Sequence, residues 1–222
     1  MARDYNETNC GEGFDLADLA LTGAQGKLIK AIHATGKPVI LVLVTGKPFS
    51  IAWEKKHIPA ILIQWYAGEQ EGSSIANILF GKTNPSGHLT VSFPQSSGHL
   101  PAYYNHLPTD RGFYHKPGSY EQPGRDYVFS SPGPLWAFGH GLTYTTFNYT
   151  DMQIQQSIDS IKVFVTVKNT GRWAGKAVPQ LYVRDVFSSI STPVKQLKAF
   201  NKVALEPVSY THLRAHETAA NL

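Results

Sequence analysis

Two uninterrupted apolar runs limit what this 222-residue chain can fold into. The runs "PVILVLVTG" (38–46) and "IPAILIQWY" (58–66) are rich in β-branched residues and show no alternation with polar ones. Strands of this kind are buried on both faces, as in a parallel sheet covered by helices. Helical spacing of apolar residues in 23–38 and 71–81 predicts a helix before the first run and another after the second. We therefore expect a layered α/β arrangement in this part of the chain.

A different pattern fills the C-terminal part of the sequence. Residues 160–171, "SIKVFVTVKNTG", place a β-branched residue at every second position, as in a strand with one buried face. Two more strand-like runs, 175–185 and 195–205, follow at the spacing of a β-sandwich. The intervening segment 108–145 is rich in Pro, Gly and aromatic residues and shows no periodicity. The sequence thus predicts two domains of different class.

Composition excludes several classes of function. Hydrophobic residues make up 42% of the chain and charged residues 16%, which is typical of a globular protein. The net charge of +4 comes from scattered Lys and Arg, so we expect no nucleic-acid partner. No apolar run reaches the ~18 residues of a membrane span, so we expect no membrane partner. His212 and His216 are one helical turn apart without a third ligand nearby; we expect no metal site and no cofactor.

Two carboxylates occupy the loop between the second apolar run and the following helix. Glu69 and Glu71 lie in "GEQEG", and ligands of open α/β sheets bind beyond the carboxyl ends of strands. A glutamate here could act as a general acid or base. A helix N-terminus favours the ionised form, however, so burial or a second carboxylate must hold the proton. The alternative is that Glu71 is only an acidic first-turn residue.

Four blocks of the sequence resemble one protein family. The segment "IPAILIQWYAGEQEGSSIANILFGKTNPSGHLTVSFP" (58–94) resembles the signature of the family 3 glycoside hydrolases, the β-glucosidase and β-xylosidase group. Similar blocks occur in the family's order at "CGEGFDLADLALTGAQGKLIKAI" (10–32), "PLWAFGHGLTYTTFNY" (134–149) and "VTVKNTGRWAGKAVPQLYVRD" (165–185). The resemblance, over about residues 5–207, implies part of a layered α/β sandwich domain followed by an incomplete all-β fibronectin type III-like (immunoglobulin-like) sandwich.

The resemblance also implies an activity. Its members are retaining glycosidases that hydrolyse terminal non-reducing β-linked sugars with two carboxyl groups. An aspartate nucleophile comes from a TIM-like barrel, and the acid/base glutamate maps onto "GEQEG", so onto Glu71 or, slightly less favoured, Glu69. Trp65 and Tyr66 are candidate sugar contacts, although aromatic residues more often pack in a core. The implied partners are an oligosaccharide or β-glycoside and the barrel of the same parent chain, in a periplasmic or secreted enzyme.

The departures from the family pattern carry their own expectations. The 222 residues hold no counterpart of the nucleophile aspartate, so we expect no turnover from them alone. The alternative function is a noncatalytic carbohydrate-binding or scaffolding module. Residues 208–222 are polar and helix-leaning without strand alternation, and we expect a non-native tail there; a genuine helical tail is the alternative. The expected limits are 1–107 for the α/β part, 108–145 for the connecting segment, 146–207 for a truncated β-sandwich and 208–222 for the tail.

Overall fold

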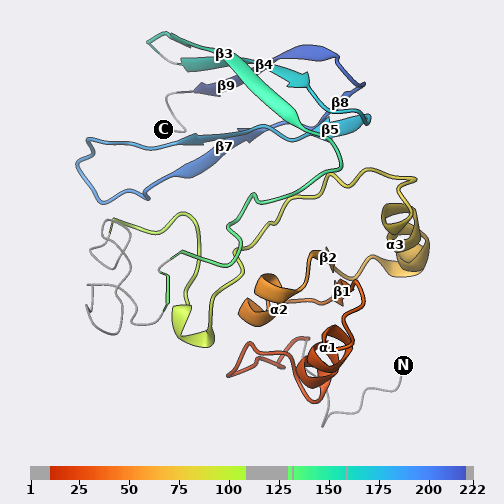
Figure 1. The fold of residues 1–222 in the computed structure, drawn as a ribbon. Coiled ribbons are helices and arrows are strands. Elements are labelled where there is room, and N and C mark those ends of the chain that lie inside the picture. The colour runs from red at the N-terminus through yellow and green to blue at the C-terminus, as the bar shows by residue number, and fades with distance from the viewer. Residues whose placement is uncertain (1–10, 109–129, 132, 159, 219–222) are drawn as a thin grey trace. The chain divides into compact units, whose positions relative to one another are not determined.

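The computed structural model describes residues 11–108, 130–131, 133–158 and 160–218 (Figure 1). Within them the chain forms two compact units. The expected domain limits at residues 107, 145 and 207 stay a prediction. The first unit comprises Met1–Glu71, Val91–Tyr103 and Thr109–Phe138, and the second comprises Gly72–Thr90, Tyr104–Pro108 and Gly139–Leu222.

The first unit contains the layered α/β part, as the sequence predicted. Its two strands pair in parallel, with Ile40 opposite Ala60 and Val44 opposite Gln64. A helix precedes each strand, but the apolar residues at helical spacing in the first helix are not covered: Leu28 is 60% exposed and Ile32 is 44% exposed. The elements in chain order are α1 (Gln25–His33), β1 (Ile40–Val44), α2 (Ala52–His57), β2 (Ala60–Gln64), the 3₁₀ helix η1 (Gly68–Gln70) and, further on, η2 (Ser97–His99).

The expectation that these strands are buried on both faces is wrong for β1. Leu43 is 6% exposed, whereas Ile40 is 55% exposed and Val44 is 47% exposed. The sheet has two strands within the described residues, so each strand has one neighbour along the hydrogen-bonding direction. The composition of β1 is therefore that of a parallel strand buried on both faces, but only part of the strand is buried in this two-stranded sheet.

Aromatic contacts organise the rest of the first unit. Phe93 is fully buried, and its backbone amide donates to the carbonyl oxygen of Trp136 at 2.8 Å. Between α1 and α2, the ring of Trp53 stacks on His57 with centroids 4.3 Å apart, and His33 meets both rings edge-on. Nδ1 of His57 lies 2.7 Å from the carbonyl oxygen of Trp53; a carbonyl only accepts, so Nδ1 carries the proton. This stack joins the two helices that flank β1.

The second unit contains the β-sandwich. Its strands are all antiparallel and form three sheets in the orders β3-β4-β9, β5-β8 and β6-β7. The alternating residues of β4 point inward as predicted: Val167 is fully buried against Ala177 and Leu205. The elements are most of α3 (Glu71–Leu79), then β3 (Phe147–Gln156), β4 (Ser160–Asn169), β5 (Gly175–Ala177), β6 (Gln180–Val183), β7 (Gln196–Phe200), β8 (Val203–Leu205) and β9 (Tyr210–Thr218).

The buried side-chain amide of Asn169 connects several segments of the sandwich by hydrogen bonds. The side chain of Asn169 is fully buried, and its Nδ2 donates to the carbonyl oxygens of Trp173 at 2.8 Å and Leu205 at 3.1 Å. Its Oδ1 accepts from the hydroxyl of Thr145 at 2.7 Å and the backbone amide of Gly171 at 3.1 Å. Both donor hydrogens and both lone pairs are therefore used, which is what burial of an amide requires.

The expectation of a helix-leaning tail is wrong for residues 210–218. These residues form β9, which pairs with β4 from Ser160 opposite Thr218 to Lys168 opposite Tyr210. Burial does alternate along β9, with half-buried Thr211, Leu213 and Ala215. Only Leu213 of these is strongly apolar, and it packs on the sandwich core, so the alternation was too weak to see in the sequence. The non-native origin of 208–222 stays a prediction.

The turn into β9 carries backbone strain. The amide of Ser209 donates to the carbonyl oxygen of Glu206 at 3.1 Å, and Val208, the third residue of this turn, has φ 63°. A β-branched residue rarely adopts this left-handed conformation, which favours glycine.

No helix in the described part of the chain is long and apolar enough to cross a membrane.

Candidate active site

The loop after β2 brings both predicted carboxylates to the carboxyl end of the parallel strand pair. The chain leaves β2 at Gln64 and turns through η1, and Glu71 is the first residue of α3. Gly68 has φ 74°, a conformation that L side chains avoid, so this turn depends on a glycine. The side-chain Nε2 of Gln64 donates to the carbonyl oxygen of Glu71 at 3.4 Å and ties the helix start to the strand end.

The two carboxylates differ in their surroundings. Glu69 is exposed in η1, and Glu71 is half-buried at the helix start. Neither side chain makes a hydrogen bond or ion pair with any residue that the structure describes. Both carboxylates are thus open to an incoming ligand.

The two predicted aromatic contacts separate in the structure. Trp65 is half-buried and packs against the fully buried Phe93, with ring centroids 6.3 Å apart. Tyr66 is 64% exposed at the start of the same loop. Trp65 therefore serves the core of the first unit, and Tyr66 presents its ring at the surface. Contact of either ring with a sugar stays a prediction.

A third carboxylate sits on a turn of similar construction. Glu12 is exposed between Gly11 at φ 139° and Gly13 at φ 77°, and the amide of Phe14 donates to the carbonyl oxygen of Gly11 at 3.1 Å. Two glycines in the left-handed region fix this turn and hold Glu12 outward. The sequence signal was the "GEG" triplet of 11–13, which the strand-to-helix argument did not weigh.

Among the described residues, no group of three or more His, Cys, Asp and Glu could hold a metal ion. His212, one of the two spaced histidines, lies on β9 and shares a hydrogen bond of 3.0 Å with the hydroxyl of Thr166.

A parallel layered α/β part followed by an antiparallel sandwich defines a two-domain class, and comparison with known proteins gives its family. Residues 3–144 match the glycosyl hydrolase family 3 C-terminal domain, and residues 177–218 match the fibronectin type III-like domain. The chain belongs to the glycosyl hydrolase family 3 C-terminal domain family. The resemblance seen in the sequence, and the fold that it implied, are thereby confirmed.

Similar proteins cover nearly all of this chain. A beta-xylosidase of Formosa agariphila is 43% identical over 89% of it, and a periplasmic beta-glucosidase of Salmonella typhimurium is 42% identical over 88%. The structure of a beta-glucosidase from Listeria innocua in complex with glucose superposes with a TM-score of 0.86 at 37% identity, over 95% of this chain and 29% of that one. The chain spans 27% and 26% of the two curated relatives, so about a quarter of their length.

Proposed function

We propose that this chain supplies the acid/base glutamate of a retaining β-glycosidase that cleaves terminal non-reducing β-linked sugars. The observation that carries the proposal is the position of Glu71, which begins α3 beyond the carboxyl end of β2. Family membership and relatives named as beta-glucosidases and beta-xylosidases support the reaction class. Glu69 is the alternative, two residues earlier on η1.

The proposed chemistry divides between two carboxyl groups. A nucleophile aspartate attacks the anomeric carbon while the glutamate donates its proton to the leaving glycosidic oxygen. The same glutamate then removes a proton from the water that hydrolyses the glycosyl-enzyme intermediate. Burial of the Glu71 carboxyl by the bound sugar would favour its protonated form. The exposed ring of Tyr66 would offer the sugar an apolar face beside it.

The nucleophile is proposed to lie outside these 222 residues, in the barrel that the family resemblance implies. A general acid without its nucleophile cannot form the covalent intermediate. The purified 222-residue chain should therefore not hydrolyse 4-nitrophenyl β-glucoside or β-xyloside. Turnover that disappears in the double variant Glu69→Gln/Glu71→Gln would contradict this expectation.

The acid/base role is testable in a chimera, in which residues 11–218 replace the matching segment of a full-length relative. Removal of the general acid should slow hydrolysis of a substrate with a poor leaving group by about 10²–10⁴-fold. A substrate with an activated leaving group, such as a dinitrophenyl glycoside, needs little protonation and should lose much less. Added azide should restore turnover and give a β-glycosyl azide, because it needs no general base.

Three single variants assign the role: Glu71→Gln, Glu69→Gln and Glu12→Gln. We expect the leaving-group dependence and the azide rescue in Glu71→Gln. The same pattern in Glu69→Gln would move the role by two residues along the loop. The pattern in Glu12→Gln alone would move it to the glycine-flanked turn and overturn the assignment to "GEQEG". Unchanged turnover in all three would favour the noncatalytic carbohydrate-binding or scaffolding module.

A further inference from the structure

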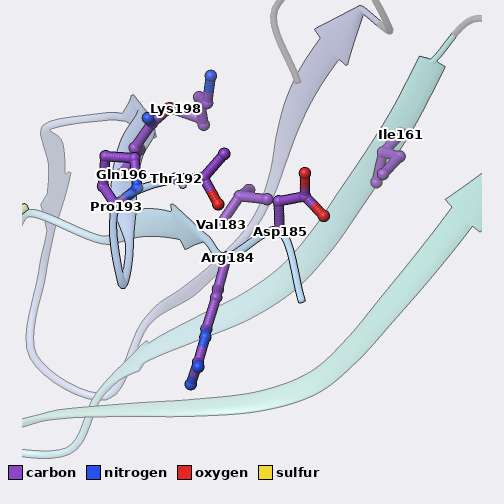
Figure 2. Close-up of a pocket in the computed structure, with 8 residues that line it drawn as sticks. All are labelled: Ile161, Val183, Arg184, Asp185, Thr192, Pro193, Gln196 and Lys198. Carbon is purple, nitrogen blue, oxygen red and sulfur yellow. The ribbon is translucent and has the colours of Figure 1, made fainter. Parts of the chain in front are cut away.

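A cleft of about 310 Å³ opens on the second unit, formed by β6, β7 and the loop between them (Figure 2). Three half-buried polar side chains, those of Thr192, Gln196 and Lys198, gather on one side of it, as Figure 2 shows. Ile161 of β4 lies on the opposite side and adds an apolar wall. None of the candidate acid/base glutamates lines this cleft.

The charges at the end of β6 are arranged asymmetrically. Arg184 extends away from its neighbour Asp185, whose carboxylate turns toward Ile161 (Figure 2). Oδ1 of Asp185 accepts a hydrogen bond from the backbone amide of Phe187 at 3.2 Å. The guanidinium of Arg184 has no hydrogen bond or ion pair with any residue that the structure describes. An unpaired guanidinium offers a planar fork of donors that matches a carboxylate.

The cleft continues beneath the loop that follows. A second depression of about 150 Å³ shares Arg184, Asp185 and Thr192 with the first and reaches the serines of the β6–β7 loop. Such a surface offers hydroxyl, amide and carboxylate groups for the hydroxyls of a sugar.

The charge of the surroundings favours a negative ligand. Residues 146–218 hold nine Lys and Arg against five Asp and Glu. Lys198 lines the cleft together with Arg184. Asp185 is the one acidic side chain among the residues that line the first cleft, and it already accepts one backbone hydrogen bond.

We propose that this cleft binds an acidic oligosaccharide, with a uronate carboxylate on Arg184 and sugar hydroxyls on Thr192 and Gln196. The saccharide class rests on the proposed function, whereas the preference for an anion rests on the charges of the cleft. The site would hold a saccharide chain on the sandwich and would need no turnover to be detected.

Calorimetric titration of the 222-residue chain tests the site with three probes: trigalacturonate, neutral cellotriose and inorganic phosphate. We expect trigalacturonate to bind at least about tenfold more tightly than either of the others at low salt, and more weakly as salt is added. Arg184→Met should weaken that binding at least about tenfold. Arg172→Met removes the same charge from the exposed turn between β4 and β5 and should leave it unchanged.

Other outcomes overturn the proposal. Absence of trigalacturonate binding would do so, and so would equal affinity for cellotriose or for phosphate. An equal loss in Arg172→Met would show a nonspecific charge effect. The double variant Glu69→Gln/Glu71→Gln should bind trigalacturonate as the unmodified chain does. Failure of the acid/base assignment and failure of the cleft are thereby distinguishable.

Discussion

The parallel strand pair of the first unit and the antiparallel sandwich of the second use similar β-branched runs with different results. In the sandwich, alternation places every second side chain of β4 toward a shared core, and Val167 is fully buried. In β1 the run has no alternation, and Val44 at its end is half-exposed. An antiparallel strand needs one covered face, whereas a strand of this apolar type needs two. The sandwich is therefore the better covered of the two regions.

The largest expected effect comes from the buried amide of the sandwich. Asn169→Ala removes four hydrogen bonds and leaves two carbonyl groups, a hydroxyl and an amide without that partner. We expect a loss of about 3 kcal/mol in the free energy of unfolding, measured by urea denaturation. Asn148→Ala on the exposed face of β3 is the control and should change it by less than about 0.5 kcal/mol. An equal effect of the two variants would contradict the role given to Asn169.

A matched pair of valines tests the comparison directly. Val167→Ala opens a cavity in the sandwich core and should lower the free energy of unfolding by about 2 kcal/mol. Val44→Ala removes the same atoms from a half-exposed strand end and should cost less than about 1 kcal/mol. Thermal unfolding of both variants measures the difference. A larger cost at Val44 would show that β1 is covered in solution.

Two turns test the same backbone conformation in the two units. Gly68 has φ 74° and Val208 has φ 63°. Glycine tolerates this left-handed conformation, whereas a β-branched valine is strained in it. Val208→Gly should raise the free energy of unfolding by about 1 kcal/mol, and Gly68→Ala should lower it by about 1 kcal/mol. A Cβ at Gly68 would meet no atom within 4 Å, so any loss there reports backbone strain alone.

If Val208→Gly instead destabilises the chain, the turn into β9 does not adopt this conformation in solution. Gly72→Ala is the control for Gly68→Ala, because Gly72 lies in the first turn of α3 with open space around it. Alanine is the better helix former there, so this variant should be neutral or slightly stabilising.

The smallest expected effect is a pH dependence in the first unit. The backbone amide of Ala20 and the hydroxyl of Ser97 donate to the carboxylate of Asp18 and hold its pKa below the usual value of 3.8. A carboxyl group of this kind stabilises the fold above its unfolded-state pKa, and that contribution disappears as pH falls through the lower folded-state value. Unfolding midpoints of the unmodified chain and Asp18→Asn should therefore converge between pH about 5 and about 2. A constant difference would exclude the proposed cause.

Much of this architecture was accessible from sequence because it follows local periodicity. The helical spacing before β1 and the alternation in β4 gave the right elements. β9 was missed because its inward positions are a threonine, a leucine and an alanine, and pairing with β4 rather than local preference makes it a strand. The contact of Ser97 with Asp18 joins residues far apart in the sequence, and no period signals such a contact.

The candidate site was predictable only in part. Both loop carboxylates lie in the turn between β2 and α3, as predicted, because these elements follow one another directly in the sequence. The burial of Trp65 depends on Phe93, which packs against it from a distant segment of the sequence. Two adjacent aromatic residues look alike in sequence, and tertiary packing alone decides which of them stays at the surface.

The stack of Trp53 on His57 gives the first unit an optical reporter of its own. An indole 4.3 Å from an imidazole senses whether that imidazole is neutral or charged, and Nζ of Lys30 lies 5.2 Å from the same indole ring. The sandwich carries Trp173 instead, which is 64% exposed and makes no ring contact with any residue that the structure describes. With Trp65, Trp136 and Trp173 replaced by phenylalanine, emission of Trp53 should therefore follow the packing of α1 on α2 while the sandwich stays folded.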